Sequence, residues 1–170
     1  TLSADMAGGK VHPFSGFTMS VCQLRPESRG QIRLASANPG DQPHIHPNYL
    51  STENDRQAAV AAIRLARRIA AADPLQGLIE GEELPGPSAQ SDEEILEFAR
   101  GNGATIFHPT STCRMGREDD PLAVVGHDLK VRGIGNLWIA DCSVMPRIVS
   151  GNTNLPAIMI GERLSEFLKE

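Results

Sequence analysis

Long apolar runs and clustered basic residues are both missing from this chain of 170 residues. The longest apolar stretches, such as 58–63 and 155–160, fall well short of the ~18 residues that span a bilayer, so we expect no transmembrane segment. Lys and Arg number 16 against 21 acidic residues, and no block of one sign occurs. A nucleic-acid-binding face needs clustered basic residues, so nucleic acid is not an expected partner.

Paired cysteines are missing as well. Cys22, Cys113 and Cys142 are odd in number and widely spaced, which fits neither a disulfide framework nor a C-x-x-C metal or redox pair. This usage favours a reducing compartment, and we expect a cytoplasmic location, with membrane association of a longer protein as the alternative. The chain begins at Thr1 with neither Met nor a leader, which favours a segment of a longer polypeptide.

Short strands are predicted in the first third of the chain. Residues 17–24 are apolar and hydroxyl-rich, turn formers follow at 26–30, and 31–36 alternate in polarity, which together predict an antiparallel hairpin. Residues 44–46, His-Ile-His, predict a further short strand. Its two imidazoles could bind a metal, but no acid or cysteine at suitable spacing joins them. We therefore interpret these histidines as exposed and expect no metal site.

Capping signals predict the first two helices. Thr52 and Asp55 precede a helix over 56–72, which Asp73-Pro74 should end. The following stretch, 77–90, is rich in turn formers and predicts a surface loop.

Ser91 and Glu94 form a capping box for a second helix through Arg100, which Gly101 should end. A last helix is predicted over 154–169, where Pro156 is tolerable in the first turn.

Two apolar runs bounded by glycines, 129–131 and 137–140, predict short strands. Between them Gly133-Ile134-Gly135 resembles the start of a dinucleotide-binding loop. The third glycine is absent and the strand follows the glycines instead of preceding them, so we reject that interpretation. Helices and antiparallel strands together predict an α+β fold.

A histidine in a stiffened loop is the first candidate for chemistry. His108 opens the block HPTSTCRMG, where the adjacent Pro109 restricts the backbone. Neutral imidazole, with an ordinary pKa of about 6.5, suits proton abstraction near neutral pH. A loop histidine satisfied by ordinary hydrogen bonds would show the same sequence, so both interpretations stay open.

The start of the last helix is the second candidate. Gly151, Asn152 and Thr153 precede it, and helix N-termini present unpaired N–H groups and a partial positive charge. Such an end suits a carboxylate, a phosphate or a ring that becomes anionic on reduction. Ordinary capping by Thr153 explains the same pattern.

At these blocks the chain resembles the C-terminal part of the glucose-methanol-choline family of flavin-dependent oxidoreductases, particularly its choline dehydrogenase-like and alcohol dehydrogenase-like members. The family's HPxGTxRMG pattern is visible over 108–116, with Ser111 where glycine is usual. A longer signature, GIGNLWIADCSVMPRIVSGNTNLPAIMIGERL, spans 133–164. The stretches RPESRGQIRL and PNYLS also look like the family's substrate domain.

The resemblance implies a domain arrangement. Residues 1–117 would belong to the substrate-binding domain, an antiparallel sheet with packed helices. Residues 118–170 would return to the FAD-binding domain and add a strand and the closing helix. The FAD fingerprint G-x-G-x-x-G is not found, so the N-terminal FAD-binding part of the polypeptide would be a missing partner. Alone, the chain is expected to be inactive and to bind FAD weakly.

The resemblance also implies a reaction. His108 would accept the hydroxyl proton of a small alcohol while a hydride passes to the flavin, and Asn152 would donate a hydrogen bond to the developing alkoxide. The expected cofactor-binding residues are Ala140, Asp141, Asn152, Thr153, Asn154 and Leu155. A catalytically silent binding or structural module is the alternative. Neither the particular alcohol nor the electron acceptor follows from these residues.

Overall fold

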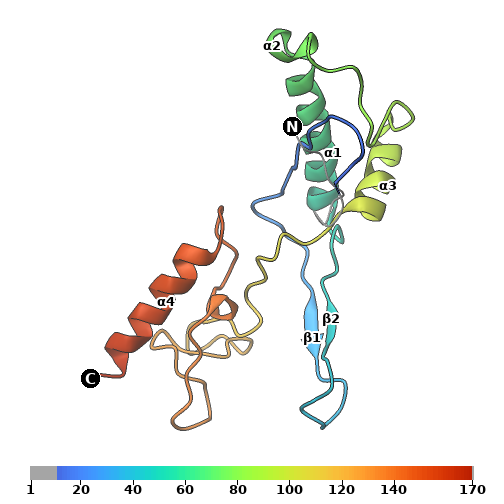
Figure 1. Ribbon diagram of the computed structural model, residues 1–170. Coiled ribbons are helices and arrows are strands. Elements are labelled where there is room, and N and C mark those ends of the chain that lie inside the picture. Colours follow the sequence, from blue (N-terminus) through green and yellow to red (C-terminus); the bar gives the residue numbers. More distant parts are fainter. Residues whose placement is uncertain (1–10, 170) are drawn as a thin grey trace. The chain divides into compact units, whose positions relative to one another are not determined.

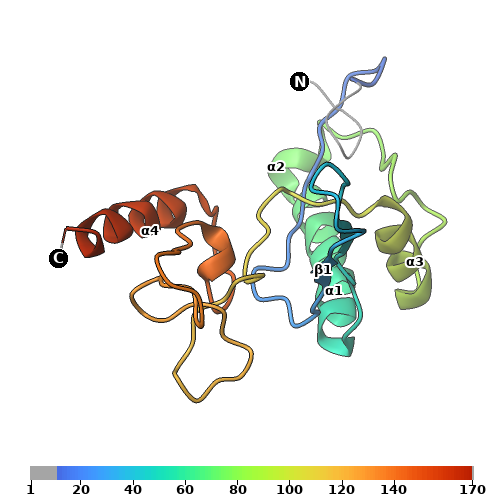
Figure 2. The ribbon, with the colours of Figure 1, turned by 90° about the horizontal axis from the view of Figure 1, so that it is seen from below.

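The computed structural model describes residues 11–169, which divide into two units. The helical unit comprises the described residues up to Gly30 together with Pro47–Thr105. The C-terminal unit comprises Gln31–His46 together with the described residues from Ile106 onward. Figures 1 and 2 show the elements of each unit from two directions. Within the described residues, no helix is both long and apolar enough to cross a bilayer.

The helical unit contains α1 (Glu53–Ala70), α2 (Asp73–Gln76) and α3 (Asp92–Asn102). α1 packs against α3, and its Val60 joins Ala89 and the fully buried Ile95 in a small apolar core. The predicted cap is confirmed, because the Thr52 hydroxyl accepts from the Asp55 N–H at 3.3 Å. α1 ends two residues earlier than predicted, and the Asp73-Pro74 pair begins α2.

The capping box of α3 is confirmed, since Ser91 and Glu94 exchange both hydrogen bonds. The expectation that Gly101 ends this helix is wrong. Gly101 lies inside α3, where a glycine costs only ~1 kcal/mol, and Asn102 extends the last turn by donating to the Phe98 carbonyl at 3.0 Å. The chain leaves the helix at Gly103, where a Cβ would lie 2.6 Å from the Ala99 carbonyl oxygen.

Asp55 ties the turn at residues 26–28 to the start of α1. It is 3% exposed, and its carboxylate accepts from the backbone N–H groups of Glu27 and Ser28 at 2.7–3.1 Å and from the Ser28 hydroxyl. Burial alone would raise the pKa of Asp55, but these hydrogen bonds outweigh it and hold the pKa below its ordinary value. The carboxylate therefore remains charged and anchors the turn.

The C-terminal unit contains a two-stranded antiparallel sheet, β1 (Gln31–Arg33) and β2 (His44–His46), in which Ile32 lies opposite Ile45. The predicted pairing of 17–24 with 31–36 is therefore wrong. The connection over 36–41 decides the partner, because a hydrogen-bonded turn from Asn38 to Asp41 folds β2 back onto β1. Both histidines of β2 are exposed, as predicted.

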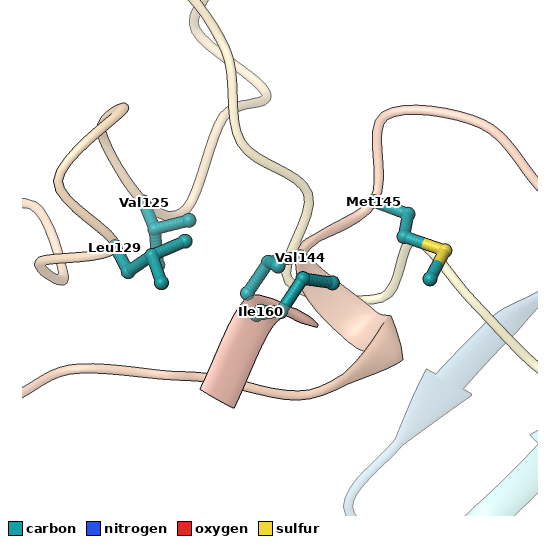
Figure 3. Close-up of a cluster of buried hydrophobic side chains, with 5 residues drawn as sticks. All are labelled: Val125, Leu129, Val144, Met145 and Ile160. Atoms are coloured by element: carbon teal, nitrogen blue, oxygen red, sulfur yellow. The ribbon is translucent and has the colours of Figure 1, made fainter. Parts of the chain in front are cut away.

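The core of the C-terminal unit gathers five buried side chains, shown in Figure 3: Val125, Leu129, Val144, Met145 and Ile160. Ile160 comes from α4 (Asn154–Phe167), which ends two residues before the predicted end. Val144 comes from a short 3-10 helix, η1 (Cys142–Val144). This core therefore fixes the start of α4 and η1 on one scaffold.

The predicted strands at 129–131 and 137–140 are single bridges. Lys130 pairs with Trp138 in one antiparallel bridge, and no ladder continues from it in the described chain. Leu129 and Asn136 both adopt positive φ, 64° and 57°, so tight turns interrupt extended backbone on either side.

Candidate functional site

The loop that carries the histidine motif runs along η1. Its backbone N–H groups donate to carbonyls of η1 at 2.8–3.3 Å, pairing Ser111 with Cys142, Cys113 with Ser143 and Met115 with Val144. Because Val144 is fully buried, these bonds tie the loop to the apolar core of the unit.

Two arginines fix the far end of this loop. Arg114 forms an ion pair with Asp120 at 2.9 Å. The Arg132 guanidinium donates to the carbonyls of Gly116, Arg117 and Asp120 at 2.6–3.0 Å. Arg132 thus satisfies backbone groups that a loop would otherwise leave to water. We conclude that the loop is preorganised, as a site on a loop requires.

Ser111 departs from the family pattern, and the backbone at this position shows why glycine is usual there. Its φ is 74°, in the left-handed region that favours glycine, which is the residue usual at this position. The Ser111 hydroxyl lies 3.0 Å from the Thr110 hydroxyl, and its N–H bonds to the Cys142 carbonyl. The turn therefore persists with a serine at the cost of local backbone strain.

His108 is half-buried, and its Nδ1 lies 2.9 Å from the hydroxyl oxygen of Thr153. Thr153 is 6% exposed and precedes α4, yet its side chain makes no capping hydrogen bond to the helix. Ordinary capping by Thr153 is therefore wrong as an explanation of the helix start. The structure joins the two candidate features of the sequence through one hydrogen bond across 45 residues.

The other expected site residues lie at the start of α4 and just before η1. Asn152 is exposed and directly precedes Thr153, while Asn154 and Leu155, also exposed, open α4. The Asp141 carboxylate accepts from the Ser143 N–H at 2.7 Å and so caps η1. Ala140 is half-buried against the core.

An open hollow of about 360 Å³ lies between the histidine loop, η1 and the start of α4. The residues that flank His108, Phe107 and Pro109, contribute to its wall. Other wall residues, which the sequence analysis did not single out, are Ile32, Thr112, Cys142, Ser143 and Ala157. Thr112, Cys142, Ser143 and Ala157 lie inside the two family motifs, but the motifs alone do not show which of their side chains face one hollow.

The start of α4 suits an electron-rich group. The N–H groups of Asn154 and Leu155 lack acceptors within the helix, Pro156 has no N–H, and the first turn contains no acidic residue. The positive end of the helix dipole is therefore not compensated by a side chain of its own. In the described residues, no group of three or more His, Cys, Asp or Glu is gathered to hold a metal.

The structure thus places a loop histidine, a residue type that can exchange a proton near neutral pH, beside a helix start whose first N–H groups lack acceptors within the helix. The chain belongs to the GMC oxidoreductase family, whose sequence profile matches residues 26–161. The resemblance seen in the sequence is thereby confirmed.

Relatives in the family share this region at high identity. The chain is 45% identical over 161 residues to the alcohol dehydrogenase [acceptor] of Pseudomonas putida, covering 95% of this chain and 29% of that protein. It is 43% identical over 162 residues to the mitochondrial choline dehydrogenase of Mus musculus, covering 95% and 27%. The chain therefore spans less than a third of the length of these curated relatives.

A solved relative supports the fold. The FAD-dependent oxidoreductase of Chaetomium thermophilum, in complex with a small fragment, matches with a TM-score of 0.78 and 31% identity over 85% of this chain and 25% of that chain. The chain is thus similar to part of a flavoprotein oxidoreductase.

Proposed function

We propose that this chain is the catalytic C-terminal portion of a flavin-dependent enzyme that oxidises the CH–OH group of a small alcohol to an aldehyde or ketone. The observation that carries the proposal is the hydrogen bond between His108 and Thr153, which brings the histidine motif to the start of α4. A catalytically silent module with the same fold is the alternative, and the turnover measured below distinguishes the two. Identity above 40% to an alcohol dehydrogenase and a choline dehydrogenase supports the substrate class.

FAD fits the residues at the start of α4. The residues that would hold it are Ala140, Asp141, Asn152, Thr153, Asn154 and Leu155. The unpaired N–H groups of Asn154 and Leu155 and the helix dipole would stabilise negative charge on the reduced ring. When bound, FAD supplies the two-electron acceptor for the hydride of the alcohol carbon.

His108 is the proposed general base. Its Nδ1 is engaged by Thr153, which leaves Nε2 as the nitrogen that can take the hydroxyl proton of the alcohol. The half-buried ring is held by a loop that is hydrogen-bonded to η1. Less conformational entropy is therefore lost when the ring is aligned with a bound substrate.

Asn152 is the proposed donor to the substrate oxygen. Its exposed side chain lies one residue from the partner of His108. A neutral amide can donate a hydrogen bond to the developing alkoxide without competing for the proton. In this proposal His108 removes the hydroxyl proton, and Asn152 stabilises the negative charge left on the substrate oxygen.

The proposed partner of this chain is the FAD-binding part of the same polypeptide. Three side chains on α4 are apolar and largely exposed: Leu155 at 75%, Ile158 at 54% and Met159 at 60%. Covering them would bury apolar surface that otherwise faces water. We assign 1–117 to the substrate-binding domain and 118–170 to the segment that returns to the FAD-binding domain.

The test is the His108→Ala variant of the flavin-loaded enzyme. We expect turnover to fall by about 10²- to 10⁴-fold, the range for loss of a general base, with flavin absorbance unchanged. The control is His127→Ala, because His127 is an exposed histidine in the same unit. Near-parental turnover of His108→Ala with intact flavin would refute the proposed role.

A further inference from the structure

We propose that Thr153 is a positioning residue that fixes the tautomer of His108. Its hydroxyl oxygen accepts a hydrogen bond from Nδ1–H, which leaves the lone pair on Nε2 for the substrate proton. The inference rests on the proposed function, because it assumes that His108 is the base.

The surroundings of Thr153 fix where its hydroxyl lies. The residue is 6% exposed, and its backbone carbonyl accepts from the Ala157 N–H at 3.0 Å and from the Cys142 thiol at 3.7 Å. Its hydroxyl oxygen lies 2.9 Å from His108 Nδ1. The backbone that carries this hydroxyl is thus held by α4 and by Cys142, and the threonine itself is buried.

The direction of this hydrogen bond follows from what a base must do. An imidazole that takes a proton at Nε2 carries a hydrogen on Nδ1 both before and after the transfer. A hydroxyl oxygen that accepts from Nδ1–H serves both states without rearranging. If the hydroxyl instead donated its hydrogen to Nδ1, the neutral ring would carry its own hydrogen on Nε2. Nε2 would then have no lone pair to take the substrate proton.

A second threonine in the same chain shows what the usual arrangement looks like. Thr52 precedes α1 with extended backbone, φ −98° and ψ 154°, and its hydroxyl caps the helix at the Asp55 N–H. Thr153 precedes α4 with φ −86° and ψ −1°, and its side chain makes no such bond. The Thr153 hydroxyl therefore hydrogen-bonds to His108 and does not cap α4.

The experiment compares Thr153→Val, Thr153→Ser and Thr52→Val in the flavin-loaded enzyme. Valine keeps the shape and removes the hydroxyl, so kcat should fall by about 10- to 100-fold with KM nearly unchanged, as for loss of an orienting partner. Serine restores the hydroxyl and most of kcat. Thr52→Val, the matched control, should lower thermal stability through the lost cap and leave kcat unchanged.

A second readout does not depend on turnover. Nitrogen-15 NMR of histidine-labelled enzyme reports the tautomer of His108, whose resonances are identified by their loss in His108→Gln. The wild type and Thr153→Ser should show the Nδ1–H tautomer, and Thr153→Val should lose its predominance.

An Nε2–H tautomer in the wild type, an unaltered tautomer in Thr153→Val, or equal loss of kcat in the serine and valine variants would each overturn the inference. Unchanged turnover in His108→Ala would overturn the proposed function instead, while the NMR result would still report on the hydrogen bond.

Discussion

Replacing Asp55 with Asn removes the charged anchor between the turn at 26–28 and α1. Its carboxylate accepts hydrogen bonds from two backbone N–H groups and one hydroxyl, all from Glu27 and Ser28. An asparagine retains one acceptor oxygen and turns an NH₂ group toward the remaining donors. At least one of these part-buried donors then loses its acceptor, and the hydrogen bonds that survive are no longer to a charged group.

The magnitude follows from those contacts. A hydrogen bond to a charged group contributes about 1.5–3 kcal/mol, and the substitution removes or weakens several such bonds at once. We therefore expect Asp55→Asn to lower the free energy of unfolding by about 2–4 kcal/mol at pH 7. The control is Asp119→Asn, because the ion pair of Asp119 with Arg117 is exposed and such pairs contribute at most ~1 kcal/mol.

The loss should also depend on pH. The pKa of Asp55 is lowered in the folded state from its ordinary value of 3.8, so the unfolded chain binds more protons in that range and stability rises with pH. The contribution is complete above that ordinary value and disappears as pH falls below it through the lower folded pKa.

Urea denaturation followed by circular dichroism, at pH values from 7 down to 3, measures both effects. The wild type and Asp55→Asn should converge in stability as the pH falls. Surface substitutions usually change the free energy of unfolding by less than about 0.5 kcal/mol. A change as small as that in Asp55→Asn at pH 7 would refute this account of the anchor.

Two further changes test the site and its loop. Asn152→Ala should lose about 2–4 kcal/mol of transition-state stabilisation, measured as a fall in kcat/KM. Asn152→His should retain more activity, because imidazole can also donate a hydrogen bond. Equal losses in the two variants would contradict the donor role. Ser111→Gly should raise the free energy of unfolding by about 0.5–1 kcal/mol in urea titrations, since glycine adopts φ 74° without strain. A loss of stability would show that the serine hydroxyl outweighs the strain.

The helix starts were predictable from sequence because their signals are local. Thr52 with Asp55 and Ser91 with Glu94 lie within one helical turn of each other, so their capping bonds form wherever the helix forms. Helix ends were less predictable. Gly101 resembled a stop, but Gly103 is the residue whose backbone approaches the preceding turn too closely for a side chain.

Strand pairing could not be predicted in the same way, because the connecting segment determines which two strands lie side by side. The alternation at 31–36 indicated a strand, which the structure has over Gln31–Arg33 only, and the turn near Asn38 gave β1 its partner at 44–46 instead of 17–24. At 129–140 the apolar runs were present, and positive φ at Leu129 and Asn136 limited them to a bridge.

The sequence by itself determined the family, because the motifs at 108–116 and 133–164 are long and specific. Only the tertiary structure decided that Thr153 bonds to His108 and does not cap its helix. That contact joins residues 45 positions apart, and it depends on the shared core beneath η1 and α4. Short-range propensities act within a turn or two of chain, whereas the direction of a side chain at a site is set by packing between distant segments.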